Sequence, residues 1–251
     1  MRYTFRVQYI GKNYAGSQLQ AGSDLPTIQG ELEKALSTLI CGDSANNKRP
    51  VKTIFSGRTD RGVNSVGQVV HFDYDKPIVA SRFMYSLNEI LPDDISVSDL
   101  KEVSSSFHAQ KSAKKRHYVY EFINRRLKNA FDGDLLRIKY HVDIERMQKA
   151  LDYIKGEHDF SSFKSSGTLN PSKICFIYEA KVSKVGDKVI IDIIGNRFLY
   201  NMVRAIVGTL IEIEGHNLQP EHMKDVLEAK DRRKAGQNVS PYGLTLVEVT
   251  Y

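Results

Sequence analysis

The stretch that decides the fold reads Phe55-Ser-Gly-Arg-Thr-Asp-Arg-Gly-Val-Asn-Ser-Val-Gly-Gln-Val-Val-His-Phe72. Apolar, β-prone residues stand at both of its ends, which predicts two strands joined by a loop. Three glycines between them allow the backbone to turn sharply or to approach a ligand closely: Gly57, Gly62 and Gly67. One carboxylate, Asp60, lies in the middle of this loop between Arg58 and Arg61.

Asp60 has two interpretations on local grounds. Nearby positive charge keeps a carboxylate ionised even when it is desolvated, and an ionised, poorly solvated Asp on a loop is what a carboxylate nucleophile requires. The same residues also fit an ordinary turn, because Asp-X-Gly is a common turn former and ion pairs on loops are mostly solvated. The local pattern leaves both interpretations open.

Size and composition narrow the class of protein. A chain of 251 residues predicts one large domain or two modest ones, and 41% hydrophobic with 26% charged residues is ordinary for a globular protein. The net charge of +6 favours a polyanionic partner such as nucleic acid, although a merely basic protein has the same balance. Cys41 and Cys175 are too few for a disulfide framework or a zinc site, which favours a reducing compartment. Without an apolar signal region or membrane-length apolar run, we expect a cytoplasmic protein.

The first part of the sequence predicts the element order β-α-β-β-α-β. Its first strand, over 2–10, alternates apolar residues (Tyr3, Phe5, Val7, Tyr9) with polar and basic ones. Thr27 is expected to cap the first helix and Ser81 the second, while the polar tract at 42–50 is typical of a flexible loop. A strand over 95–103 closes this part. The helices are expected to bury the apolar residues Ile28, Leu32, Leu36, Leu39, Phe83, Leu87 and Ile90.

The polar, basic stretch at 104–115 predicts a domain junction, with an N-terminal lobe over 1–104 and a C-terminal lobe over 105–251. In the second lobe we expect strands at 116–124, 175–185, 188–194 and 244–251. Helices are expected after the capping residue Asp143, at 198–214 and at 221–230. The economical interpretation is two similar α+β lobes, the second returning its final strand to a central sheet.

A basic residue on an apolar helix is the second candidate for chemistry. In the helix over 198–214, the core stripe is Phe198, Met202, Ile206, Leu210 and Ile213, whereas Arg197, Asn201, Arg204 and Gly208 share another face. If Arg204 is buried it needs an anionic partner, for which Asp60 is a candidate. Alternatively, its apolar stem lies on the helix while its head reaches water.

A tyrosine strand is the third candidate. Tyr118 and Tyr120 lie two residues apart on one strand face, after the basic residues Lys111, Lys114, Lys115 and Arg116. Aromatic side chains on a sheet beside lysines and arginines stack single-stranded bases. Tyrosines with a buried ring and a wet hydroxyl give the same pattern.

The loop Ser56–Val63 resembles the catalytic loop of the TruA family of tRNA pseudouridine synthases, whose pattern is Gly-Arg-Thr-Asp-x-Gly-Val-His-Ala. The sequence departs from it at Asn64 and Ser65. The segment Asn201–Gly208 resembles the part of the family that supplies the basic partner of the catalytic Asp, and Phe107-His-Ala with Tyr118 resembles a second motif. Further matches cover nearly the whole chain in the same order: Tyr9–Gln20, Thr27–Gly30, Leu91–Ile95, Gly156–Phe163, Ala235-Gly236 and Gly243–Leu246.

The resemblance implies two similar lobes built from RRM-like β-α-β units. These lobes would share a central mixed, mainly antiparallel sheet, with helices on one face and a basic cleft between the lobes. It also implies an enzyme that isomerises uridine to pseudouridine at positions 38–40 of the tRNA anticodon stem-loop, as a homodimer and without cofactor or metal. Asp60 would be the nucleophile, Arg204 its basic partner and Tyr118 the residue that stacks on uracil. The expected substrate-binding residues are Arg58, Arg61, Lys114, Lys115, Arg116 and Tyr118.

Three alternatives remain. Because Asn64 and Ser65 depart from the motif, an enzyme of this family that acts on other tRNA uridines fits as well. A non-catalytic basic RNA-binding protein would keep the charge and lose the chemistry. A hydrolase using Asp60 as an acceptor would need a metal cluster or a second positioned carboxylate, and the seven histidines have no metal-ligand spacing. The cluster Lys230, Arg232, Arg233 and Lys234 suits either a helix C-terminus or RNA phosphate.

Overall fold

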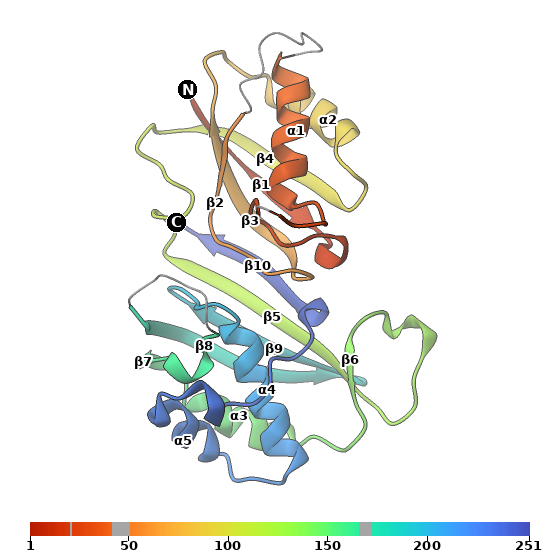
Figure 1. Ribbon diagram of the computed structural model, residues 1–251, viewed down its shortest axis with the longest axis vertical. Helices are drawn as coiled ribbons and strands as arrows, with labels where there is room; N and C mark the ends of the chain where they lie inside the picture. Colours follow the sequence, from red (N-terminus) through yellow and green to blue (C-terminus); the bar gives the residue numbers. More distant parts are fainter. Residues whose placement is uncertain (21, 42–50, 166–171) are drawn as a thin grey trace. The chain divides into compact units, whose positions relative to one another are not determined.

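The computed structural model describes residues 1–20, 22–41, 51–165 and 172–251 (Figure 1). The predicted loop at 42–50 lies outside the described residues. The chain divides into two compact units, one made of Met1–Ala113 with Leu246–Tyr251 and the other of Lys114–Thr245. No described helix combines the length and the apolar character that crossing a membrane would require.

The first unit has the predicted element order. It runs β1 (Arg2–Tyr9), α1 (Ile28–Cys41), β2 (Thr53–Phe55), β3 (Asn64–Asp73), α2 (Ala80–Ile90) and β4 (Ile95–Val103). Strand β1 lies between β3 and β4 and pairs antiparallel with both, while β2 pairs antiparallel with the end of β3. The last strand, β10 (Leu244–Thr250), follows β3 in the strand order and has most of its length in this unit.

Alternation along β1 builds the core of the first unit as expected. All four predicted inward side chains are at most 4% exposed. They pack with Ile28, Leu32, Leu36, Phe55, Phe72 and Leu87 from the helices and neighbouring strands. Thr27 caps α1, because its Oγ1 accepts the Gly30 N–H at 3.1 Å.

Two expectations for α2 are wrong. The N-cap is Val79, which makes no side-chain capping bond, so Ser81 lies inside the first turn rather than before it. The helix begins two residues earlier than a cap at Ser81 would place it, because the Phe83 N–H already bonds to the Val79 carbonyl at 3.0 Å. Ile90, expected in the core, is 40% exposed at the end of the helix.

The second unit contains β5 (Lys115–Asn124), β6 (Leu136–Ile138), α3 (Ile144–Asp152), β7 (Gly156–Asp159), β8 (Ile174–Val185), β9 (Lys188–Gly195), α4 (Met202–Gly215) and α5 (His222–Ala229). Strand β9 pairs antiparallel with β5 and β8, β7 pairs antiparallel with β8, and β6 pairs parallel with β5. Asp143 caps α3 as predicted, accepting the Glu145 and Arg146 N–H groups at 2.9 and 3.1 Å. The short strands β6 and β7 were not predicted.

Helix α4 starts four residues later than expected, at Met202. Its N-cap, Asn201, has φ +61, a left-handed conformation that does not fit within an α-helix. The helix therefore begins only after this residue. Short 3-10 turns complete the description: Gly11–Asn13, Ala130–Asp132, Ser161–Phe163, Arg232–Lys234 and Pro241–Gly243.

The α+β prediction is confirmed. The described residues form ten strands, mostly antiparallel, and five α-helices. Within each unit the helices cover one face of that unit's strands (Figure 1).

Candidate active site

Asp60 lies in the loop between β2 and β3 of the first unit, on a backbone that is held from two sides. Asp60 forms an isolated antiparallel bridge with Gly16. Next to it, Ser17 N–H donates to the Thr59 carbonyl at 3.0 Å, and the Thr59 N–H donates to Ser17 Oγ at 2.8 Å. These bonds fix the backbone at 59–60 against the segment that follows β1.

The side chains around Asp60 combine a buried anchor with exposed charges. Thr59 is 6% exposed, and its Oγ1 lies 2.7 Å from the hydroxyl of Tyr9. Burial raises the pKa of Tyr9 to about 12, so this phenol keeps its proton at neutral pH. Arg58 and Arg61 are exposed and Asp60 is half-buried. The backbone next to Asp60 is therefore held, and the two arginines that flank Asp60 in the sequence are exposed to solvent.

At two glycines near Asp60 the backbone packs so closely against another segment that a larger residue would not fit. A Cβ on Gly11 would lie 2.1 Å from the Val63 carbonyl oxygen, and one on Gly67 would lie 1.9 Å from that of Val247. Gly62 has φ +81, as a sharp turn requires. Gly57, in contrast, has open space around its Cβ position.

The two departures from the family pattern both bond to backbone. Asn64 Oδ1 accepts the Gly11 N–H at 2.9 Å. Ser65, 1% exposed, donates its Oγ to the Leu246 carbonyl at 3.1 Å and accepts the Gln68 N–H at 2.9 Å. Both side chains thus hold the start of β3, a role that the sequence alone did not indicate.

In the second unit, Tyr118 and Tyr120 point toward the helices from β5. Tyr118 is 9% exposed, and its ring meets the edge of Phe198 at a centroid distance of 5.1 Å. Tyr120 is fully buried, donates its hydroxyl to the Ser240 carbonyl at 3.0 Å and has its pKa raised by burial. Tyr120 therefore packs, whereas Tyr118 keeps a small accessible surface.

Arg204 is half-buried in the first turn of α4. Its Nε donates to the Val239 carbonyl at 2.8 Å, and an Nη donates to Asn201 Oδ1 at 2.8 Å. Both of these acceptors are neutral, so the guanidinium is oriented without having its charge neutralised by them. It lies near Tyr120, whose pKa its charge acts to lower against the larger effect of burial.

Asn201 is a residue whose importance sequence reasoning missed. Besides accepting from Arg204, it donates its Nδ2 to Ser165 Oγ at 3.1 Å, and Asn238 donates to the same Oγ at 3.2 Å. The available signal was the residue type, because Asn tolerates the left-handed backbone that would otherwise need glycine.

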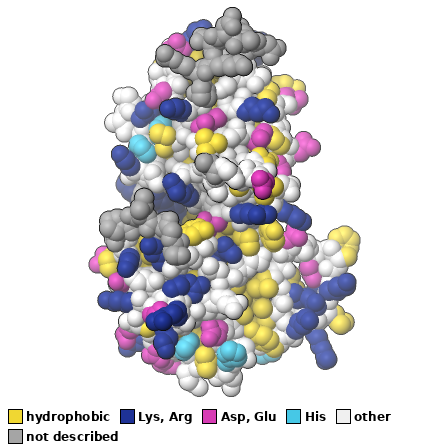
Figure 2. All heavy atoms as spheres, viewed as in Figure 1, with side chains coloured by type: hydrophobic (Ala, Val, Ile, Leu, Met, Phe, Trp, Pro, Cys, Tyr) yellow, Lys and Arg dark blue, Asp and Glu magenta, His cyan; other side chains and the backbone are white. Residues whose placement is uncertain are grey.

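The basic residues before Tyr118 point in different directions. Arg116, on the face of β5 that carries Tyr118, donates to the Asn196 carbonyl at 2.7 Å. Lys114 and Lys115 are exposed, and the Lys115 ammonium lies 4.6 Å from the centre of the Tyr178 ring. Figure 2 shows Lys and Arg side chains spread over the drawn face of each unit, with Asp and Glu among them.

The basic cluster at 230–234 has local partners. Arg232 donates to the carbonyls of Ala235 and Gly236 and to Asn238 Oδ1, at 3.0 to 3.1 Å. Arg233 pairs with Asp231, and its hydrogen bonds lower the pKa of that carboxyl to about 2. Across the described residues, no group of three or more His, Cys, Asp and Glu is arranged to hold a metal ion.

The site residues divide between the two units. Asp60, Arg58 and Arg61 belong to the first, whereas Tyr118, Arg204, Arg116, Lys114 and Lys115 belong to the second. Within the first unit Ser17 holds the backbone next to Asp60, and within the second unit Asn201 and the Val239 carbonyl hold Arg204.

Comparison with known proteins places the chain in a family. Residues 150–251 match the family model described as tRNA pseudouridine synthase. The tRNA pseudouridine synthase A of an Exiguobacterium species is 40% identical over 98% of this chain and 96% of its own. That of Anoxybacillus flavithermus is 42% identical over 98% of this chain and 96% of its own. A chain in the crystal structure of a Cbf5–Nop10–Gar1 complex superposes with a TM-score of 0.39 at 10% identity, over 84% of this chain and 54% of that one. Because the relatives match over nearly their whole length, the chain belongs to the family of tRNA pseudouridine synthases.

Proposed function

We propose that this protein isomerises uridine to pseudouridine in the anticodon stem-loop of tRNA, with Asp60 as the nucleophile. Family membership supports the reaction and the tRNA substrate. The observation that carries the assignment of Asp60 is its loop. The backbone at 59–60 is fixed by Ser17 and Gly16, and half-buried Asp60 lies between two exposed arginines in the sequence.

The reaction breaks the bond between N1 and the ribose C1′, rotates the base and joins C5 to C1′. C5 loses its proton to solvent and N1 takes up a proton in its place, so the reaction consumes neither electrons nor water. Asp60 acts at C1′, on the base, or as a base at C2′, and each route requires an ionised carboxylate. Arg58 and Arg61 supply nearby positive charge that keeps it ionised.

Groups of the second unit complete the assignment. Tyr118, which is 9% exposed, stacks on the uracil. Arg204, oriented by Asn201 and by the Val239 carbonyl, serves as the basic partner of Asp60. Arg58, Arg61, Lys114, Lys115 and Arg116 bind backbone phosphate around a nucleotide that is turned out of its stack.

Release of tritium from the uracil C5 of tRNA tests the chemistry directly. We expect the wild-type protein to release the label and Asp60→Asn to abolish release while tRNA binding persists. Asp75→Asn is the matched control, because Asp75 is an exposed carboxylate of the same unit. Release of the label by Asp60→Asn at the wild-type rate would refute the assignment of Asp60 as the nucleophile.

The target is tested with transcripts in which the uridines at positions 38, 39 and 40 are replaced by cytidine. We expect label release to fall with each replacement and to stop when all three are gone. Undiminished release from the triple replacement would assign the enzyme to other tRNA uridines. We further propose that the protein acts as a homodimer, each tRNA lying across both subunits.

A further inference from the structure

A glutamine occupies a core position in the first unit. The inward side chains of β3 alternate along the strand, and those of Phe72 and Val70 pack in the apolar core. Gln68 takes the next inward position and is 0% exposed. Burying an amide costs free energy unless its polar atoms are bonded, so an apolar residue would serve packing alone better. An amide at this position therefore indicates a role beyond packing.

Both ends of the Gln68 amide bond to the loop between β2 and β3. Its Nε2 donates to the Gly57 carbonyl at 3.0 Å, and because a carbonyl only accepts, this bond fixes which end of the amide is the nitrogen. Its Oε1 accepts from the hydroxyl of Ser56. The Ser56 N–H also donates to the Val69 carbonyl at 2.8 Å. One side chain thus holds two consecutive residues of the loop that leads to Asp60.

The same amide reaches the loop a second time through Tyr9 of β1, the strand that runs beside β3 (Figure 1). Gln68 Nε2 also donates to the Tyr9 hydroxyl, at 3.4 Å, and that hydroxyl lies 2.7 Å from Thr59 Oγ1. Since the phenol oxygen accepts from Gln68, its own proton can be donated to Thr59. Burial raises the pKa of Tyr9 to about 12, so the proton stays in place at neutral pH. Thr59 directly precedes Asp60.

We infer that Gln68 and Tyr9 are positioning residues for the Asp60 nucleophile. Together their bonds hold the loop from its buried side at three of the four residues before Asp60. A nucleophile on a loop held in this way attacks from one geometry, so a small displacement of the loop costs rate rather than binding. The inference rests on the proposed function, because it requires Asp60 to act on the substrate. It deepens that function by naming the groups that fix the position of the carboxylate.

Tyr9→Phe tests the inference with the smallest change, because it removes the hydroxyl and keeps the ring. We expect kcat for label release from tRNA to fall about 10-fold or more, with KM and tRNA affinity unchanged. Tyr3→Phe is the matched control. Tyr3 lies on the same strand, is also 4% exposed, and donates its hydroxyl to the Lys76 carbonyl at 3.2 Å. Tyr3→Phe should therefore lose a comparable amount of stability and keep the wild-type kcat.

The dependence of kcat on pH separates positioning from proton transfer by Tyr9. Because the hydroxyl keeps its proton, the ratio of the Tyr9→Phe rate to the wild-type rate should be constant between about pH 6 and about pH 9. A ratio that changes with pH would make Tyr9 an acid or base of the reaction and would overturn its positioning role.

Gln68→Met removes the amide and keeps a side chain of similar length. We expect kcat to fall at least as far as in Tyr9→Phe, because the bonds to the loop backbone are lost as well. The combined variant should lose less than the product of the two effects, since both residues act in one network. Gln148→Met is the matched control. Gln148 also bonds to backbone through both ends of its amide, at 2.9 and 3.2 Å, but in the second unit.

Circular dichroism shows whether each variant folds, and if Gln68→Met does not, Tyr9→Phe alone decides the inference. A wild-type kcat in Tyr9→Phe, an equal fall in Tyr3→Phe, or a higher KM at unchanged kcat would overturn it. Asp60→Asn keeps the two proposals apart. If Asp60→Asn abolishes release while Tyr9→Phe behaves like the wild type, only the positioning role is lost. If Asp60→Asn releases label at the wild-type rate, the assignment of the nucleophile fails, and the positioning role fails with it.

Discussion

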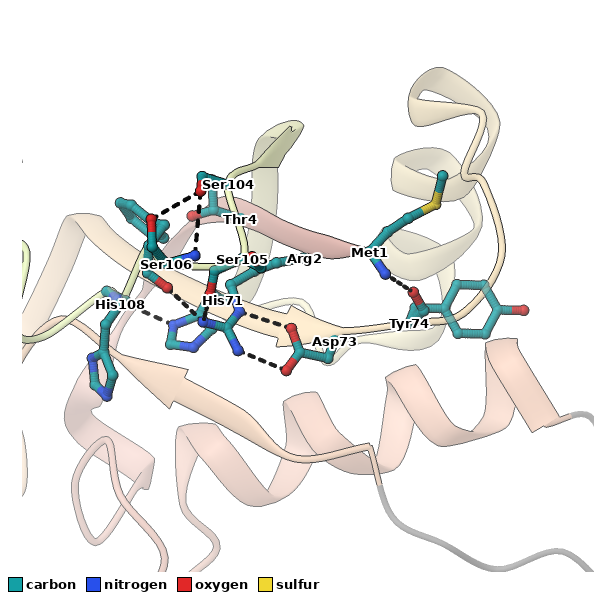
Figure 3. Close-up of polar contacts among 12 residues, drawn as sticks. Met1, Arg2, Thr4, His71, Asp73, Tyr74, Ser104, Ser105, Ser106 and His108 are labelled. Carbon is teal, nitrogen blue, oxygen red and sulfur yellow. Dashed lines mark hydrogen bonds and ion pairs between the residues drawn. The ribbon is translucent and has the colours of Figure 1, made fainter.

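Arg2 and Asp73 lie opposite each other on β1 and β3 and are joined by two hydrogen bonds, from Nε to Oδ1 at 2.7 Å and from Nη2 to Oδ2 at 2.8 Å (Figure 3). The remaining Nη1 donates to the carbonyls of Ser105 and Phe107, both at 2.7 Å. One guanidinium therefore ties the segment that follows β4 to the sheet of the first unit. The same guanidinium lowers the pKa of the Asp73 carboxyl.

Replacing Arg2 should cost more stability than replacing its carboxylate partner. Arg2→Ala removes both the ion pair and two charge-assisted bonds to backbone carbonyls, and we expect a loss of about 2–3 kcal/mol in the free energy of unfolding. Asp73→Asn should cost less than about 1 kcal/mol, because the Asp73 side chain is 64% exposed. Urea unfolding of both variants measures the difference. Equal losses would show that the bonds to Ser105 and Phe107 contribute nothing.

His71 should make stability depend on pH in mildly acidic solution. Burial, with a smaller effect from Arg2, lowers its pKa to about 4, and its Nδ1 accepts the Ala109 N–H at 3.1 Å. The unfolded chain, with a histidine pKa of about 6.5, binds the proton more readily. The contribution of His71 to the free energy of unfolding is therefore fully present above pH 6.5 and is lost as the pH falls toward 4.

The variant His71→Asn keeps a hydrogen-bond acceptor and removes the titration. We expect the wild type to lose stability between pH 6.5 and pH 4.5 with a slope of up to about 1.4 kcal/mol per pH unit from this group. In His71→Asn the slope over that interval should be shallower. Unfolding free energies at several pH values supply the comparison, and parallel curves for the two proteins would exclude His71 as the source.

Local patterns predicted much of the fold because they depend on neighbours in the sequence. The alternation along β1 and the cap at Asp143 were correct since each is decided within a few residues. The start of α4 was missed because one backbone angle at Asn201 outweighs the helical spacing of apolar residues around it. Strands β6 and β7 have only three and four residues, too few for a pattern.

The sequence predicted which residues make up the candidate site, but it did not predict the contacts that hold them. Asp60, Arg204 and Tyr118 were recognised from short segments. The bonds that hold them join residues far apart in the sequence, such as Ser17 with Thr59 and Arg204 with Val239. Ser65 looked like a departure from a motif, and only its contact with Leu246 shows that it holds a strand. Such partners are set by tertiary packing, which a single sequence does not reveal.

An added methyl group should affect stability strongly at one glycine of the Asp60 region and hardly at another. In Gly67→Ala the new Cβ would lie 1.9 Å from the Val247 carbonyl oxygen, so β3 or β10 must move. We expect a loss of more than about 3 kcal/mol or failure to fold. Gly57→Ala meets nothing within 4 Å and should change stability by less than about 1 kcal/mol. Thermal unfolding distinguishes the two, and a Gly67→Ala protein as stable as the wild type would contradict the close approach.

Asn201 should matter to the reaction through the guanidinium it orients. Asn201→Gly keeps the left-handed backbone, because glycine adopts φ +61 without strain, and removes the bonds to Arg204 and Ser165. We expect kcat for pseudouridine formation to fall about 10-fold or more, with tRNA affinity little changed, if Arg204 acts as proposed.

Asn217→Gly is the matched control for that experiment. Asn217 also has a left-handed backbone, with φ +51, and also accepts a hydrogen bond from an arginine, Arg146, at the other end of α4. Each variant removes an Asn–Arg bond and keeps its backbone angle, and Asn201→Gly should lose somewhat more stability because it also removes the bond to Ser165. Only Asn201→Gly should slow the reaction. If single-turnover rates fall equally in both, Asn201 serves stability alone, and Arg204 is not held by it for catalysis.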